Sequence, residues 1–223
     1  MYTKKLGILL HVPAPPASQG RPAPALAEGF SRDLHRAFIA DLFARIAKLK
    51  KVPTTAFCLE DGAVKDLIPA RCGLVRQEGA VRGERIEHAL GTLLEDEGSI
   101  ACLIDSTSPD LPLVYLKRAY AKLKHRDIVL GPTFDGGLYL VGLKARVAGL
   151  FGDVVWEDGS ALRRVLDNVR SKGLSCALLP PWYAVTMETL SLLDAMLLAR
   201  RIEGRDRLRR VEHVLDAVRA DGK

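Results

Sequence analysis

Short apolar runs alternate with amphipathic segments along most of this chain. The runs predict buried β-strands, because a strand covered on both faces has no polar side. They lie at residues 5–12, 54–59, 73–76, 100–104, 127–130, 138–143 and 174–179. The amphipathic segments predict α-helices that begin after Ser31 as N-cap, at Glu84 and at Pro112, span residues 160–172, and form a C-terminal pair separated near Gly204. We therefore expect an α/β fold of three layers, α/β/α, with a mostly parallel sheet and residues 100–104 near its centre.

The segment Gly131–Gly142 joins two of these runs through Asp135-Gly136-Gly137. Paired glycines allow positive φ and let a ligand approach the main chain, while a lone carboxylate can hold a metal ion or accept a hydrogen bond from a sugar hydroxyl. Asp-Gly is also a common turn signal, so a plain hairpin accounts for the same residues. We expect a bend or hairpin at the rim of the sheet and leave both interpretations open.

Two further segments follow predicted strands, at the edge where ligands bind open α/β sheets. The loop from Pro13 to Pro24 contains Arg21, a side chain able to make bidentate contacts to phosphate. This loop is either a lid or phosphate cradle, or a flexible surface excursion. Asp105 is either a metal ligand or a loop residue whose carboxylate accepts an Asx-type bond from Thr107. We interpret Asp110 as a helix N-cap.

Composition predicts one soluble domain spanning residues 1–223, with C-terminal helices at 187–220 packed on it. The chain has 223 residues, 48% of them hydrophobic and 27% charged. Its net charge of +6 comes largely from residues 32–51 and 200–210. Acidic residues are interspersed in the second segment, which indicates a solvated helical face, and no nucleic-acid-binding motif accompanies it. We expect no nucleic acid as a partner.

No apolar run reaches the roughly 20 residues that a membrane span requires. The apolar start ends at His11 without a cleavage site of small residues, so we interpret it as a strand. The four cysteines form no Cys-x-x-Cys pair, which favours reduced thiols. We predict a cytoplasmic protein without a transmembrane segment.

Several segments, taken in order, resemble the DUF2064 family of bacterial GT-A-like glycosyltransferases, which are related in fold to nucleotidyltransferases. They are Gly83-Glu84-Arg85, Ser108-Pro109-Asp110-Leu111-Pro112, the Gly131–Gly142 block, and Leu150-Phe151 followed by Trp156. The resemblance spans most of the chain. It implies a GT-A-like, Rossmann-like fold and a transferase that uses a nucleotide-activated donor, with Mg²⁺ or Mn²⁺ neutralising the leaving diphosphate.

The chain departs from this family where the family carries basic and acidic residues. Of the basic residues in the family's Pro-rich loop, Arg21 alone has a counterpart in this sequence. Thr107 stands where the family has a metal-binding aspartate, and an aspartate appears two residues earlier, at Asp105. Ala80-Val81-Arg82 replaces Gly-Asp-Leu, and Ala184-Val185-Thr186-Met187 replaces an acidic motif.

Two hypotheses follow from the resemblance and its departures. The first is a glycosyl- or nucleotidyltransferase that binds a nucleotide or nucleotide sugar, with Asp105 and Asp135 as catalytic residues and metal ligands. The second is a degenerate relative that keeps the fold and a ligand pocket without metal-dependent transfer. Either way we expect no tightly bound metal. The substrate-binding residues we predict are Pro13, Gln19, Gly20, Arg21, Ser106, Thr107, Gly136 and Gly137.

Overall fold

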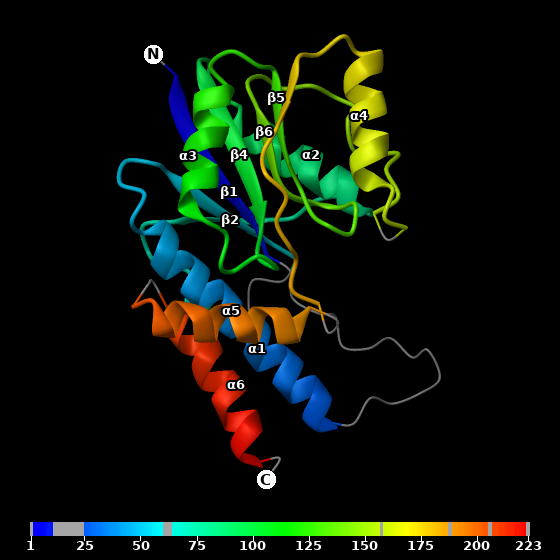
Figure 1. Ribbon diagram of the computed structural model, residues 1–223. Helices are drawn as coiled ribbons and strands as arrows, with labels where there is room; N and C mark the ends of the chain where they lie inside the picture. Colours follow the sequence, from blue (N-terminus) through cyan, green and yellow to red (C-terminus); the bar gives the residue numbers. More distant parts are fainter. Residues whose placement is uncertain are drawn as a thin grey trace.

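A computed structural model describes residues 2–10, 25–59, 64–156, 158–186, 189–204 and 207–221. Within these ranges seven strands form one sheet in the order β3-β2-β1-β4-β6-β5-β7 (Figure 1). The strands are β1 (Thr3–Leu9), β2 (Thr54–Cys58), β3 (Gly73–Arg76), β4 (Ser99–Asp105), β5 (Ile128–Pro132), β6 (Leu138–Leu143) and β7 (Cys176–Leu178). Every neighbouring pair is parallel except the two pairs that β6 makes, with β4 and with β5.

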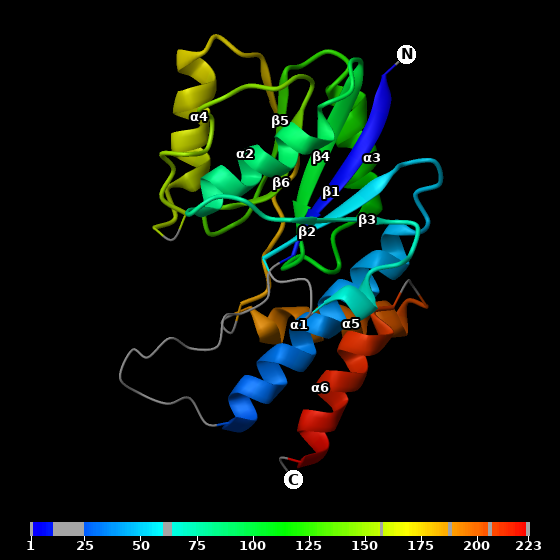
Figure 2. The same ribbon diagram turned by 180° about the vertical axis from the view of Figure 1, so that it is seen from behind.

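Helices cover both faces of this sheet, as Figures 1 and 2 show from opposite sides. One face packs on α3 (Leu113–Lys122) and on the C-terminal half of α1 (Ala25–Ile46). The other face packs on α2 (Arg82–Leu93) and α4 (Ala161–Ser171). Strands β4, β5 and β6 are buried along their whole lengths, which is why the sequence reads there as continuous apolar runs.

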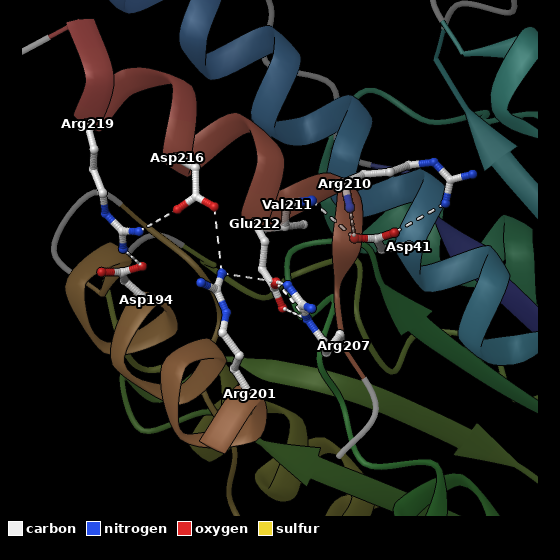
Figure 3. A network of polar contacts seen from close by, with 9 residues as sticks. All are labelled: Asp41, Asp194, Arg201, Arg207, Arg210, Val211, Glu212, Asp216 and Arg219. Atoms are coloured by element: carbon white, nitrogen blue, oxygen red, sulfur yellow. Dashed lines mark hydrogen bonds and ion pairs between the residues drawn. The ribbon is translucent and has the colours of Figure 1, made fainter. Parts of the chain in front are cut away.

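A helical lobe lies beyond the carboxyl ends of the parallel strands (Figure 1). It consists of α5 (Leu190–Ile202) and α6 (Arg209–Asp221) packed against α1, and its core includes Phe38, Leu193 and Val211. Charged side chains tie its helices together (Figure 3). Asp41 of α1 accepts hydrogen bonds from the amides of Arg210 and Val211, so it caps the start of α6.

A buried carboxylate closes the turn between α5 and α6. Glu212 is 4% exposed and forms ion pairs with Arg201 and Arg207. The hydrogen bond from Arg207, together with both positive charges, lowers the pKa of this carboxyl group despite its burial. Three arginines of the segment 200–210, namely Arg201, Arg207 and Arg210, therefore pair with acids of the lobe.

The three-layer α/β/α prediction is confirmed, with β4 at the centre of the sheet and β5–β6 as a hairpin. Two helix N-caps were predicted wrongly. Helix α1 begins at Ala25, so Ser31 lies inside it. Pro112, and not Asp110, is the N-cap of α3, because the chain from Asp105 makes two successive turns before the helix begins. Within the described ranges no helix combines the length and apolar character that crossing a bilayer requires.

Candidate functional site

A pocket of about 320 Å³ opens at the carboxyl edge of the sheet, between the strands and the helical lobe. Its volume lies within the range of small-molecule sites, and ligands of open α/β sheets bind at this edge. The polar residues that line it are His35, Arg82, Thr107, Thr133, Asp135 and Thr186. The larger apolar residues are Leu34, Phe38, Leu138, Trp156, Val185 and Leu190.

Asp105 ends the central strand β4 and is 5% exposed. Its Oδ1 atom accepts hydrogen bonds from the Thr107 amide, at 2.8 Å, and from the Thr107 hydroxyl, at 2.7 Å. The predicted Asx-type bond is therefore confirmed. Its Oδ2 atom pairs with Nη2 of Arg82 at 2.7 Å. Both carboxylate oxygens of Asp105 are thus engaged by protein donors.

Arg82, the first residue of α2, is the side chain that the sequence analysis missed. Its guanidinium lies over the Trp156 ring, with Cζ 5.2 Å from the ring centroid, and its side chain is 33% exposed. The Nε atom is buried and has no acceptor among the described residues. The available signal was a basic residue directly before Gly83-Glu84-Arg85, in the segment Ala80-Val81-Arg82 that replaces an acidic one. The contact with Asp105 joins residues far apart in sequence, and no local pattern reveals it.

Two of the segments that carry the family resemblance position Trp156. A Cβ atom on Gly83 would lie 1.8 Å from the carbonyl oxygen of Phe151, so glycine is required for α2 to pack against this loop. Glu87 accepts hydrogen bonds from the amides of Phe151, at 2.9 Å, and Gly149, at 3.3 Å. These contacts hold the loop on α2 and bring the indole to the Arg82 guanidinium.

Asp135 lies in the β5–β6 turn and is exposed to the pocket. Its Oδ1 atom accepts hydrogen bonds from the Thr133 hydroxyl and from the Gly137 amide. Its Oδ2 atom makes no hydrogen bond to a described residue. This second oxygen is therefore available to a ligand, unlike either oxygen of Asp105.

The two glycines of this turn have local structural reasons. Gly136 has φ +84°, and a Cβ atom there would lie 1.9 Å from the Gly159 carbonyl oxygen. A Cβ atom on Gly137 would lie 2.7 Å from the Thr133 hydroxyl oxygen. Gly137 lines the pocket, while Gly136 faces the protein's own backbone. That either glycine contacts substrate stays a prediction.

Backbone hydrogen bonds join the loops that form the pocket wall. The Val185 amide donates to the Thr107 carbonyl oxygen at 2.7 Å, and the Trp182 amide donates to the Pro132 carbonyl oxygen at 3.0 Å. The segment after β7 is therefore fixed to both the β4–α3 loop and the end of β5. Because these loops are tied to one another, the polar side chains that they carry are held at fixed positions around the pocket.

Five other predicted site residues are not among the described residues that line the pocket. Ser106 is buried and its amide donates to the Leu9 carbonyl oxygen, and it does not line the pocket. Pro13, Gln19, Gly20 and Arg21 lie outside the described residues. The pocket as described thus brings together Thr107, Asp135 and Gly137 from the predicted set.

Asp110 belongs to the junction of the sheet and the lobe. It is fully buried and accepts hydrogen bonds from Trp182 Nε1 (3.0 Å), the Tyr183 hydroxyl (2.7 Å) and Arg200 Nη2 (3.0 Å). Burial and the neighbouring carboxylate both raise the pKa of Tyr183, so the phenol stays protonated and donates. The Asp110 carboxylate therefore connects the β4–α3 loop to the segment after β7 and to α5.

The donor set around the pocket does not fit a divalent metal held by the protein. Mg²⁺ and Mn²⁺ require oxygen ligands that are free to coordinate, with carboxylates among them. Both oxygens of Asp105 are engaged, Asp135 offers a single oxygen that makes no hydrogen bond to a described residue, and Thr107, Ala184 and Thr186 carry no charge. The described residues contain no group of three or more His, Cys, Asp or Glu side chains placed to hold a metal.

A match to a known protein family covers more than half of the chain. The profile of the family described as "Uncharacterized protein conserved in bacteria (DUF2064)" matches residues 42–158, more than half of the chain. The chain belongs to the DUF2064 family. The match covers β4, the β5–β6 hairpin, Arg82 and Trp156, and so includes half of the residues that line the pocket.

Solved structures share the fold of this DUF2064 protein. A protein from Desulfovibrio desulfuricans G20, provisionally named a nucleotide-diphospho-sugar transferase, is 23% identical with a TM-score of 0.77, and the alignment covers 97% of this chain and 96% of that one. A 4-diphosphocytidyl-2C-methyl-D-erythritol synthase from Anaerococcus prevotii DSM 20548 is 12% identical with a TM-score of 0.58, covering 88% and 96%.

A Mycobacterium tuberculosis H37Rv protein solved in complex with manganese is 14% identical with a TM-score of 0.55, and the alignment covers 88% of this chain and 99% of that one. No curated protein matches the chain. At these identities the likeness establishes the fold, that of the nucleotide-diphospho-sugar transferases, and leaves the activity to be argued from the site.

Proposed function

We propose that this protein is a transferase that binds a nucleotide-activated donor in the pocket at the carboxyl edge of β4. One observation carries the proposal: Arg82, Thr107 and Asp135 come from three separate elements and line the same pocket. A cation, a hydroxyl and a partly free carboxylate are the groups needed to hold a diphosphate, bind a sugar or ribose, and accept a proton.

The two aspartates predicted to be catalytic take different roles in this proposal. Asp135 is the proton acceptor, because it is exposed and one of its oxygens is free of hydrogen bonds to described residues. Asp105 holds Arg82 and does not meet the substrate, because it is buried and both oxygens are engaged.

With a sugar donor, the reaction is transfer of the glycosyl group to an acceptor hydroxyl. An acceptor hydroxyl oxygen bonds to the anomeric carbon while the bond from that carbon to the diphosphate oxygen breaks. The nucleoside diphosphate leaves with the bonding electron pair, and Asp135 takes the acceptor proton. Arg82 stabilises the negative charge that develops on the leaving diphosphate.

The engaged state of Asp105 also favours a second candidate, a protein that binds a nucleotide without transferring any group. Binding and turnover separate the two. We would titrate the protein calorimetrically with nucleoside diphosphates and nucleotide sugars, and follow release of nucleoside diphosphate with simple sugar and alcohol acceptors.

Asp135→Asn should keep donor binding within about threefold and lower turnover at least 100-fold, in line with loss of a general base. Asp167→Asn is a matched control, because Asp167 is an exposed carboxylate on α4 paired with Arg163. Donor binding without any turnover would favour the second candidate. Absence of binding across the whole donor panel would refute both.

A further inference from the structure

Arg82 is placed where an incoming diphosphate needs positive charge. It is the one lysine or arginine among the described residues that line the pocket. It also begins α2, whose N-terminal end carries a partial positive charge and has no side-chain cap. A diphosphate in the pocket would meet this guanidinium.

The protein fixes this guanidinium in position before any ligand arrives. Asp105 binds Nη2 at 2.7 Å and Trp156 supports the guanidinium plane. The side chain stays 33% exposed, whereas Asp105 is 5% exposed, so the positive member of the pair faces the pocket. An arginine held in this way loses little conformational entropy on binding, and its fork matches phosphate oxygens bidentately.

The charge of the pair matters as much as its geometry. A divalent ion held by two carboxylates has no net charge, and neither has Arg82 with Asp105. The pair therefore presents a cation to a diphosphate without a metal ion. Asp135 is the one aspartate or glutamate among the described residues that line the pocket, and Thr107 and Thr186 add no negative charge. A cation supplied by Arg82 explains why both oxygens of Asp105 are engaged, and also why the donor set does not fit a metal.

We propose that Arg82 is a built-in cation that binds the diphosphate of the donor in place of a divalent metal, with Asp105 as its positioning residue. The inference rests on the proposed function, since it assumes that the pocket takes a nucleoside diphosphate moiety. It assigns Arg82 a role that requires no metal, and it predicts that binding is the same with and without one.

The test is calorimetric titration of the intact protein with UDP, CDP, GDP and ADP, each in EDTA and in MnCl₂. For the nucleotide that binds, the wild-type Kd should agree within about twofold between the two conditions. Arg82→Ala should weaken binding in EDTA by about 10- to 100-fold, the effect of losing a charge-assisted hydrogen bond. The Kd of Arg82→Lys should lie between those of the wild type and Arg82→Ala, because lysine keeps the positive charge and lacks the planar guanidinium.

Arg82→Ala also has a signature that a merely structural role would not give. It removes the Arg82 ion pair from Asp105 Oδ2, so Mn²⁺ should recover part of the lost affinity in this variant and not in the wild type. Arg163→Ala, which removes an exposed arginine of α4, is the matched charge control and should leave Kd unchanged. Circular dichroism and thermal melts confirm that each variant is folded.

The outcomes distinguish the inference from the function beneath it. If the wild type binds none of these nucleotides in either condition, the proposed function fails. If it binds one strictly in the presence of Mn²⁺, or if folded Arg82→Ala binds as tightly as the wild type, nucleotide binding stands and the role of Arg82 is refuted.

Discussion

Asp105 ends β4 and Asp110 lies in the loop that follows. Each pairs with an arginine from a helix distant in sequence, yet the two belong to different kinds of region. At the junction with the helical lobe, Asp110 is fully buried and its partner Arg200 is 13% exposed, with Trp182 and Tyr183 as further donors. At the pocket, Asp105 is almost as buried, but Arg82 is 33% exposed. The exposure of the arginine, and not that of the acid, distinguishes the pair that we propose binds a ligand from the pair buried at the junction.

The comparison predicts that the junction stabilises the fold far more than the pocket pair does. Asp110→Ala leaves the largely buried Arg200 charge without its counter-ion and the Trp182 and Tyr183 donors without their acceptor, so we expect a loss of about 3–5 kcal/mol in the free energy of unfolding. Asp105→Asn should cost clearly less, because solvent reaches Arg82. Urea denaturation measures both. A larger loss for Asp105→Asn than for Asp110→Ala would invert the comparison.

The β5–β6 turn should show the next largest effect. Gly136→Ala adds a Cβ atom 1.9 Å from the Gly159 carbonyl oxygen at a residue with φ +84°, so we expect about 2–3 kcal/mol of destabilisation and a displaced Asp135. Gly98→Ala is the control, since φ there is +74° and no atom lies within 4 Å of the added Cβ. That control should cost about 1 kcal/mol. Equal costs in urea denaturation would show that Gly159 gives way easily.

These two regions also show how far sequence reasoning reaches. The apolar runs predicted the strands and the central place of β4, because burial on both faces leaves a continuous apolar signal. The turn chemistry of Asp105 with Thr107 was predictable because the residues are neighbours. The Arg82–Asp105 and Asp110–Arg200 pairs were not, because each depends on packing that brings distant elements together. Asp110 was taken for an N-cap because local sequence cannot distinguish a capping carboxylate from a buried one.

The helical lobe offers a pH-dependent test of a third acid and arginine cluster (Figure 3). Because the folded pKa of Glu212 is lowered, chiefly by the Arg207 hydrogen bond, its contribution to stability is present above the unfolded pKa and is lost as pH falls through the folded one. Glu212→Gln should lower the melting temperature by about 2–4 °C at pH 7. The difference from wild type should shrink below about pH 4.5, the ordinary value for glutamate. A difference that stays constant down to pH 3 would show that Glu212 contributes by packing alone.

The smallest expected effect tests the pocket from the opposite direction, by adding acids. Thr107 and Thr186 both line the pocket, so Thr107→Asp with Thr186→Asp supplies two carboxylates that a divalent ion can use. The double variant should bind nucleoside diphosphate about 3- to 10-fold more tightly in Mn²⁺ than in EDTA, while the wild type shows no such difference. The uncharged control is Thr107→Asn with Thr186→Asn, which matches the shape of the added side chains. Since carboxylates repel a diphosphate unless a metal lies between them, the aspartate variant in EDTA should bind more weakly than the asparagine variant. If the two variants behave alike in both conditions, the pocket does not hold the diphosphate near these threonines, and the position assigned to Arg82 loses its support.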